Sequence, residues 1–413
     1  MNRIQTRTLA CGMPLVVEHI DGVRSAAVQW MVPGGSADDP VDRLGRAAMW
    51  SELLMRGSGT RDSRADADAY DKLGASRSAD VGTLFMRIGA TTLGERLLDV
   101  LPLLVDMVRA PRFEAEAIEP SRDLALQAIE SLQDDPQERA MLGARARHYP
   151  TPLERSGMGT PDGLKALTRD ELVNGWRAIA LPRRAIFAAA GHVDIDALAP
   201  RLDALLAGWS GGTDEPGRGP LPPRGYAHET DESNQVQIVV LHDAPAEPDA
   251  DSLLEKLLVS VLSGGMSGRL FSEVREKRGL CYSVSAGYSG GKDFGGVTAY
   301  VGTTPERAQE SLDVLLGELH RIHSPEGRIT PDEFHRAVIG MKSRLVFSGE
   351  STGARASALA VDMHRMGRPR SLAELAAEVD RVTLDQLNAY AARRNMGRMT
   401  IQTLGPAALN PPR

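Results

Sequence analysis

The stretch GGMSGRLFSEVREKRGLCY, residues Gly264 to Tyr282, decides how the rest of the chain is interpreted. A glycine-rich run opens it, and apolar residues then recur at helical spacing. Gly279 is suited to end that helix. Beyond it, apolar residues alternate with small or polar ones, which predicts a strand with one buried face. The predicted order is loop, helix, glycine stop and strand, with Met266, Leu270, Phe271 and Val274 on the helix and Leu280, Tyr282, Val284, Ala286 and Tyr288 along the buried face of the strand.

This order places two hydrogen-bond donors side by side. Arg275 lies in the last turns of the predicted helix and Tyr282 near the start of the strand. A guanidinium and a phenol are suited to hold a carbonyl oxygen as it gains negative charge. We therefore expect Arg275 and Tyr282 to form a functional pair. The alternative is an arginine on a solvated helix face and a tyrosine in an ordinary strand.

Length and composition set the class of protein. A chain of 413 residues is too long for one core, so two or more domains are expected. The net charge of −7, with both signs interspersed and no polybasic patch, argues against a nucleic-acid partner. Two cysteines, Cys11 and Cys281, make neither a disulfide framework nor a cysteine zinc site. No apolar run has the length of a signal peptide or of a membrane span. These features predict a soluble, cytoplasmic protein, with a periplasmic location left open if a leader was removed.

The sequence contains an internal duplication on either side of a linker. The run from Ser210 to Arg224 is rich in glycine and proline and has no periodicity, which is typical of a linker. Similar strand ends recur at Thr92 and Thr304 (304 − 92 = 212), and at Gly191 and Gly405 (405 − 191 = 214). We therefore predict a first half over residues 1–209, a linker over 210–225 and a second half over 226–413.

Each half has strands, a helix pair, two further strands, long helices and a closing strand. This pattern predicts an α+β fold of two similar halves, each a mostly antiparallel sheet covered by helices on one face. The expected strands cover residues 14–18, 25–32, 81–90, 235–241, 282–286 and 296–302, and the long helices cover 97–108, 118–133, 308–320 and 331–347.

The first half contains a counterpart of the quoted helix, the run LGRAAMWSELLMRGSGTR from Leu44 to Arg61. Its frame is similar to the zinc-binding helix of the M16 metallopeptidases, the pitrilysin and mitochondrial-processing-peptidase family, whose pattern G-x-A-H-x-x-E-H is an inverzincin motif. The resemblance places Ala48 at the first histidine ligand, Ser51 at the glutamate base and Glu52 at the second histidine. The spacing of the motif is retained, but its two histidine ligands and its glutamate base are replaced.

The third ligand of that family is a glutamate on a later helix, and Ala128 stands in its place. A catalytic zinc needs three protein ligands and an open position for water. The resemblance therefore implies no catalytic zinc in this chain. The alternative is a rewired site that uses Glu52, Glu130 and a distant histidine. His320 and His323 are three apart and are expected to be solvated at a helix end rather than to bind a metal.

In the second half, the resemblance includes the glycine-rich loop and an Arg-x6-Tyr pair, since 282 − 275 = 7. It extends over nearly the whole chain and implies two halves arranged like a clamshell. In two-chain bacterial members of the family, one chain carries the zinc motif and the other supplies the Arg and Tyr. This sequence resembles the second kind. Ser78 replaces the family's substrate-contacting Asn, so the resemblance does not extend to peptide binding by the first half.

The resemblance thus implies a non-catalytic subunit of a heteromeric zinc-dependent peptidase. Tyr282 would donate to the carbonyl of the peptide substrate, and Arg275 would contact a backbone carbonyl or position Tyr282. No cofactor is expected in this chain, and zinc is expected in a partner with an intact HxxEH motif. A homodimer of the isolated chain, a purely structural scaffold and a peptide-binding clamp stay open as alternatives. The residues expected to contact peptide are Gly264, Gly265, Met266, Ser267 and Gly268.

Overall fold

The structure is a computed structural model, and it describes residues 3–411. The chain divides into two compact units, each with its own sheet and core. Each unit also takes one segment from the far side of the linker. Unit 1 runs up to Ser131 and adds Thr151–Gly219 and Ser348–Arg370, whereas unit 2 contains Leu132–Pro150, Pro220–Phe347 and the chain from Ser371 on.

Unit 1 is built on a six-stranded sheet in the order β1-β2-β6-β3-β5-β4. Neighbouring strands are antiparallel except β2 and β6, which are parallel. Its strands are β1 (Arg3–Thr8), β2 (Pro14–His19), β3 (Ser25–Pro33), β4 (Ser76–Val81), β5 (Phe85–Leu93) and β6 (Ile186–Gly191). Its helices are α1 (Arg46–Leu54), α2 (Ser63–Lys72), α3 (Leu97–Arg109), α4 (Ala115–Glu130), α6 (Pro161–Ala166), α7 (Arg169–Ile179), α8 (Ile195–Leu205) and α12 (Thr352–Met366).

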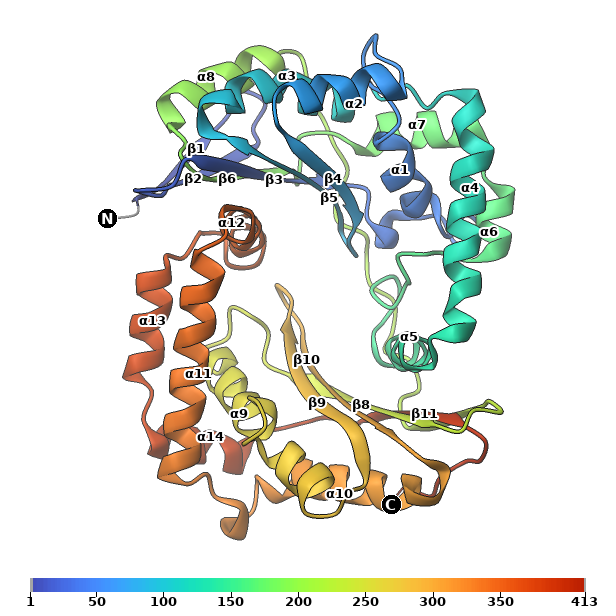
Figure 1. Cartoon of the computed structure of the whole chain (residues 1–413), viewed down its shortest axis with the longest axis vertical. Helices are drawn as coiled ribbons and strands as arrows, with labels where there is room; N and C mark the ends of the chain where they lie inside the picture. The colour runs from blue at the N-terminus through green and yellow to red at the C-terminus, as the bar shows by residue number, and fades with distance from the viewer. Residues whose placement is uncertain (1–2, 412–413) are drawn as a thin grey trace. The chain divides into compact units, whose positions relative to one another are not determined.

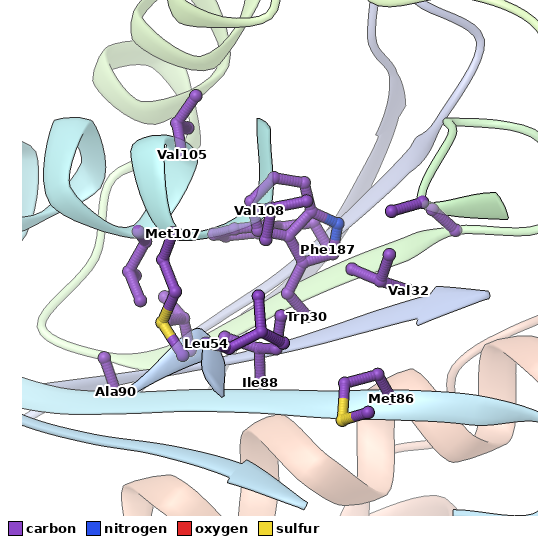
Figure 2. Packing of buried hydrophobic residues seen from close by; sticks show 14 of the residues in the cluster. Trp30, Val32, Leu54, Met86, Ile88, Ala90, Val105, Met107, Val108 and Phe187 are labelled. Atoms are coloured by element: carbon purple, nitrogen blue, oxygen red, sulfur yellow. The ribbon is translucent and has the colours of Figure 1, made fainter. Parts of the chain in front are cut away.

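One face of this sheet packs against α3 and its neighbouring helices. Trp30 on β3 and Phe187 on β6 make an edge-to-face contact, with ring centroids 5.5 Å apart. Figure 2 shows Val108 of α3 beside these two rings. The alternating apolar residues of the strands meet an amphipathic helix here, so the main core of unit 1 lies on this face.

The opposite face of the same sheet is covered by α12, as Figure 1 shows. Ala188 and Ala190 of β6 pack with Ala356 and Ala360 of α12 in a second apolar cluster. All six residues of β6 are buried. The prediction of helices on only one face was therefore wrong, because these small side chains let a helix from the second half of the sequence lie close to the sheet.

Unit 2 repeats this plan with a five-stranded sheet in the order β7-β11-β8-β10-β9, antiparallel except for the parallel pair β7 and β11. Its strands are β7 (Tyr226–Thr230), β8 (Val236–Ala244), β9 (Cys281–Gly290), β10 (Gly295–Thr303) and β11 (Thr400–Gly405). Its helices are α5 (Pro136–His148), α9 (Ser252–Ser263), α10 (Ala308–Arg321), α13 (Leu372–Arg381), α14 (Leu384–Arg393) and most of α11 (Pro331–Gly349).

Here α5, from the first half of the sequence, covers one face of the sheet. Ala140 and Ala144 of α5 pack against Val239 and Leu241 of β8. The predicted fold class, α+β with two similar and mostly antiparallel units, is confirmed. Within residues 3–411, every helix is too short or too polar to cross a membrane.

Candidate functional site

The segment quoted first folds largely in the predicted order within unit 2. Helix α9 ends at Ser263, a glycine-rich loop follows, and residues Phe271–Glu276 form a short π-helix. Gly279, with φ of +61°, ends it, because the left-handed conformation there favours glycine. Met266 departs from the prediction. It lies in the loop before the helix, and its side chain is 74% exposed.

The loop glycines have a structural role of their own. A Cβ at Gly264 would lie 2.3 Å from the carbonyl oxygen of Ser260, and one at Gly268 would lie 2.9 Å from that of Leu262. The loop can therefore fold back against the end of α9 only where no side chain intervenes. Peptide contact by residues 264–268 stays a prediction.

Arg269 fixes the point where the loop becomes helix. Its guanidinium donates to both carboxylate oxygens of Glu333, at 2.7 and 2.9 Å, and to the carbonyl oxygen of Gly327 at 2.8 Å. Burial raises the pKa of Glu333, but the hydrogen bonds from Arg269 and Thr330 and the charge of Arg269 together lower that pKa to about 2. The ion pair therefore persists at neutral pH and anchors the segment that carries Arg275.

Arg275 and Tyr282 lie together, as the sequence predicted. The Arg275 guanidinium carbon lies 4.8 Å from the ring centroid of Phe271 and 5.2 Å from that of Tyr282. Both distances fit cation–π contacts. Within residues 3–411, neither the guanidinium nor the Tyr282 hydroxyl has a hydrogen-bond partner. The cation–π contacts hold the two side chains together, and the guanidinium N–H groups and the phenol O–H stay available to a bound ligand.

Tyr282 does not lie on the buried face of its strand, so that prediction was wrong. On β10, Thr303 pairs with Cys281 and Gly302 pairs with Ser283. Tyr282 is the extra residue of a β-bulge, which breaks the alternation of side chains. It is 84% exposed, whereas Val284 two residues later is half-buried.

Cys281, next to this pair, is a poor candidate for a nucleophile. Burial raises the pKa of its thiol, although Arg275 acts in the opposite direction. A thiolate is the reactive form of cysteine, so a raised pKa disfavours that chemistry at neutral pH. The donors of Arg275 and Tyr282 are the chemically useful groups here.

In unit 1, the counterpart helix is α1, and its polar groups are engaged locally. The Ser51 hydroxyl donates to the carbonyl oxygen of Ala48 at 2.8 Å. Glu52 lies 3.8 Å from Arg56, one turn along the helix. Trp50, on the buried side, stacks edge-to-face on Trp176 of α7 at 5.3 Å. Helix α1 therefore packs into the core of unit 1 through Trp50, while Ser51 and Glu52 interact locally.

The N-terminus of α1 is capped by a buried carboxylate. Asp39 accepts hydrogen bonds from the backbone N–H groups of Gly45 and Ala47, at 2.9 and 3.0 Å. Burial raises the pKa of Asp39 to about 6, against the effect of these bonds and of Arg46. The cap is thus an environment in which the carboxylate titrates near neutral pH.

These residues do not fit a zinc ion. Ala48 and Ala128 carry no donor atom, and Ala128 is exposed on α4. Across the described chain, residues 3–411, no three or more His, Cys, Asp or Glu side chains are grouped to hold a metal. The alternative set of Glu52, Glu130 and a histidine is accordingly not assembled. Zinc in a partner chain stays a prediction.

Comparison with known proteins places both halves in one family. A model described as insulinase (peptidase family M16) matches residues 15–160, and one described as peptidase M16 inactive domain matches residues 166–341. An uncharacterized zinc protease of Mycobacterium tuberculosis is 30% identical over 413 residues, which cover 97% of this chain and 92% of the relative. The chain belongs to the peptidase M16 family.

Other M16 relatives and solved structures extend over similar lengths. An uncharacterized zinc protease of Streptomyces coelicolor is 29% identical over 98% of this chain and 90% of its own. A peptidase M16 inactive domain from Pseudomonas fluorescens superposes with a TM-score of 0.84 and 22% identity over 99% of each chain. A chain of complex III2 from Candida albicans gives a TM-score of 0.83 at 16% identity, covering 98% of this chain and 96% of its own. The two structural likenesses concern the fold.

On the M16 frame, one more predicted position can be placed. Ser78 lies exposed on β4, the edge strand of the unit 1 sheet, and pairs with Gly89. Whether this edge contacts peptide stays a prediction.

Three residues that bear on the Arg275–Tyr282 pair were not predicted from the sequence to act on it. Phe271 stands four positions before Arg275, a spacing that brings side chains together on a helix. Arg269 follows the glycine loop directly, but its partner Glu333 is too distant in sequence to be recognised. Thr303 is the residue of β10 that pairs with Cys281, and this pairing becomes visible only once the register of the two strands is known.

Proposed function

We propose that this chain is the non-catalytic subunit of a heteromeric zinc-dependent peptidase. In this proposal, Arg275 and Tyr282 bind the peptide substrate and stabilise the oxyanion that forms at a partner chain's zinc site. The observation that carries the proposal is the pair itself. Its donors have no hydrogen-bond partner within residues 3–411, while a cation–π contact of 5.2 Å holds the side chains together. Unpaired donors that are already oriented need little reorganisation when charge develops on a bound carbonyl.

The two side chains would divide the work. The Tyr282 O–H donates to the carbonyl oxygen of the scissile peptide bond, and the hydrogen bond strengthens as that oxygen becomes negative. Arg275 donates to a neighbouring backbone carbonyl or keeps Tyr282 in place through its ring. The exposed Met266 and Ser267, in a loop without other large side chains, would lie along the peptide.

Water activation is assigned to the partner. Ala48, Ser51, Glu52 and Ala128 offer no ligand set, and neither a guanidinium nor a phenol produces hydroxide at neutral pH. The partner is therefore proposed to be an M16 chain with an intact HxxEH motif, and peptide cleavage is expected only in the mixture.

The experiment mixes the purified chain with such a partner and measures peptide cleavage by wild type, Tyr282→Phe and Arg275→Ala. Each substitution is expected to lower kcat by roughly 10²-fold or more while assembly stays intact. Arg278→Ala is the matched control, because Arg278 is close by but paired with Glu273 at 2.8 Å. Full activity of both variants in an assembled complex would favour a structural scaffold. Chelator-sensitive cleavage by the chain alone would overturn the proposal.

A further inference from the structure

The bulge at Tyr282 is specific to unit 2. In unit 1, β4 and β5 occupy the equivalent place, and Ser76 pairs with Thr91 and Arg77 with Ala90 without a register shift. The two strands begin alike, since Gly74 and Gly279 both have positive φ, at 59° and 61°. The regular pairing of β4 with β5 shows that this strand pair can form without a bulge.

The same comparison shows where the extra residue enters. Ser76 and Cys281 each stand two positions after the turn glycine, and each pairs with a threonine of the neighbouring strand, Thr91 or Thr303. In unit 1 the next residue pairs regularly, whereas in unit 2 Tyr282 is left over. An extra residue bends the strand and re-aims its side chain. Among the residues that the structure describes, this strand pair has the bulge in unit 2 and not in unit 1, and unit 2 also carries the Arg and Tyr pair.

Two buried hydroxyls hold the backbone next to this bulge. The Thr303 hydroxyl donates to the carbonyl oxygen of Leu280 at 2.5 Å, and the Ser311 hydroxyl of α10 donates to Thr303 Oγ1 at 3.2 Å. Thr303 is 5% exposed and Ser311 is fully buried, at 0%. In addition, the Arg307 guanidinium donates to the carbonyl oxygen of Gly279. Two successive carbonyls before the bulge are thus fixed by side chains from the end of β10 and from the following turn.

We propose that Thr303 is a positioning residue for Tyr282. Together with Ser311, it fixes the bulge and so turns the phenol away from the sheet, toward the side on which Arg275 lies. Valine at 303 would keep the volume of threonine but leave the Leu280 carbonyl without its buried donor, and the backbone would shift to find another. The consequence for catalysis rests on the proposed function, whereas the effect of Thr303 on the tyrosine does not.

The direct test follows the Tyr282 ring in the full chain labelled with 3-fluorotyrosine. Its fluorine resonance is assigned by its loss in Tyr282→Phe, a tractable task with seven tyrosines. Thr303→Val is expected to shift or broaden this resonance, and Thr303→Ser, which keeps the hydroxyl, is expected to preserve it. Ser311→Ala, which leaves Thr303 unsupported, should shift it in the same direction if the valine variant does not fold. An unchanged resonance in folded Thr303→Val or Ser311→Ala overturns the proposal.

The second test uses the mixed complex. Thr303→Val is expected to lower kcat by about tenfold with little change in KM, because a misplaced donor costs transition-state stabilisation. The double variant Thr303→Val/Tyr282→Phe should be no slower than Tyr282→Phe alone, since Thr303 acts through the phenol. Additive losses would overturn the positioning role. If no mixture cleaves peptide, the proposed function fails and the fluorine experiment still decides this inference.

Discussion

Arg355 of α12 and Glu18 of β2 form a buried ion pair within unit 1, with Arg355 Nε 2.7 Å from Glu18 Oε2. The side chains are 2% and 1% exposed. The pair joins a helix from the end of the chain to a strand near its beginning. Removal of one partner would leave an uncompensated buried charge, which typically costs about 3–5 kcal/mol.

We therefore expect Arg355→Met to lower the free energy of unfolding by about 3 kcal/mol or more, measured by urea denaturation. Arg365→Met, on the same helix, is the control and should change it by about 0.5 kcal/mol or less. The double variant Glu18→Leu/Arg355→Met should recover much of the loss, because no charge is then left unpaired. A stability of Arg355→Met equal to that of the control would contradict this account.

His242 in unit 2 predicts a pH dependence of stability. Its Nδ1 lies 2.8 Å from the carbonyl oxygen of Asp243, and its Nε2 faces Arg394 Nη2 at 3.0 Å. Burial, followed by the charge of Arg394, lowers the pKa of His242 to about 3. The unfolded chain binds a proton below about pH 6.5 that the folded chain does not take up, so stability falls as the pH falls from there.

The expected slope from this group is about 1.4 kcal/mol per pH unit below about pH 6. Denaturant unfolding of wild type and His242→Gln at pH 7, 6 and 5 measures it, and the variant should have the shallower slope. His335→Gln, on the exposed side of α11, is the matched control. Parallel slopes for wild type and His242→Gln would show that His242 is protonated in the folded state.

The α1 positions predict how the chain responds to zinc. Wild type has no donor at Ala48 or Ala128, so added zinc or a chelator should leave its unfolding midpoint unchanged. The variant Ala48→His/Glu52→His/Ala128→Glu would restore three ligand types of the M16 frame and should bind zinc in calorimetric titration. Stoichiometric zinc binding by wild type that is lost in Glu52→Gln would show that a rewired site exists after all.

Phe271 supplies one of the two rings around the Arg275 guanidinium, at 4.8 Å. Phe271→Leu keeps an apolar side chain and removes the ring, which should cost about 0.5–1 kcal/mol of cation–π attraction. In the mixed complex we expect kcat to fall about three- to fivefold, as Arg275 becomes less well oriented. Leu270→Met, on the buried side of the same helix, should retain activity. A Phe271→Leu variant as active as wild type would argue that Tyr282 alone orients the guanidinium.

Local patterns predicted the order of the site segment well. The glycine run, the apolar spacing to Val274 and the stop at Gly279 are each decided within a few residues of chain. The face of Tyr282 was not predictable in that way. A strict alternation from Leu280 to Val284 requires every residue to have a partner on β10, and the extra residue becomes visible only when the register with Thr303 and Gly302 is known.

The covering of both sheet faces was missed for a different reason. The run AIFAAAG, which ends at Gly191, was recognised as a strand, and its continuous small apolar residues indicate burial on both sides. The helix that buries the second side is α12, more than 150 residues later. No periodicity in either segment specifies that pairing, which depends on tertiary packing.

This exchange of helices determines what a break in the chain would do. A cut in the linker at residues 210–225 would separate the sheet of unit 1 from α12 and that of unit 2 from α5 as covalent pieces, but each fragment would still supply the other's missing helix. A nicked protein should therefore stay associated and folded. Either fragment expressed by itself would expose an apolar sheet surface, with Ala188 and Ala190 of β6 in one and Val239 and Leu241 of β8 in the other, and should self-associate. Although the sequence is a twofold repeat, neither half is expected to fold correctly without the other.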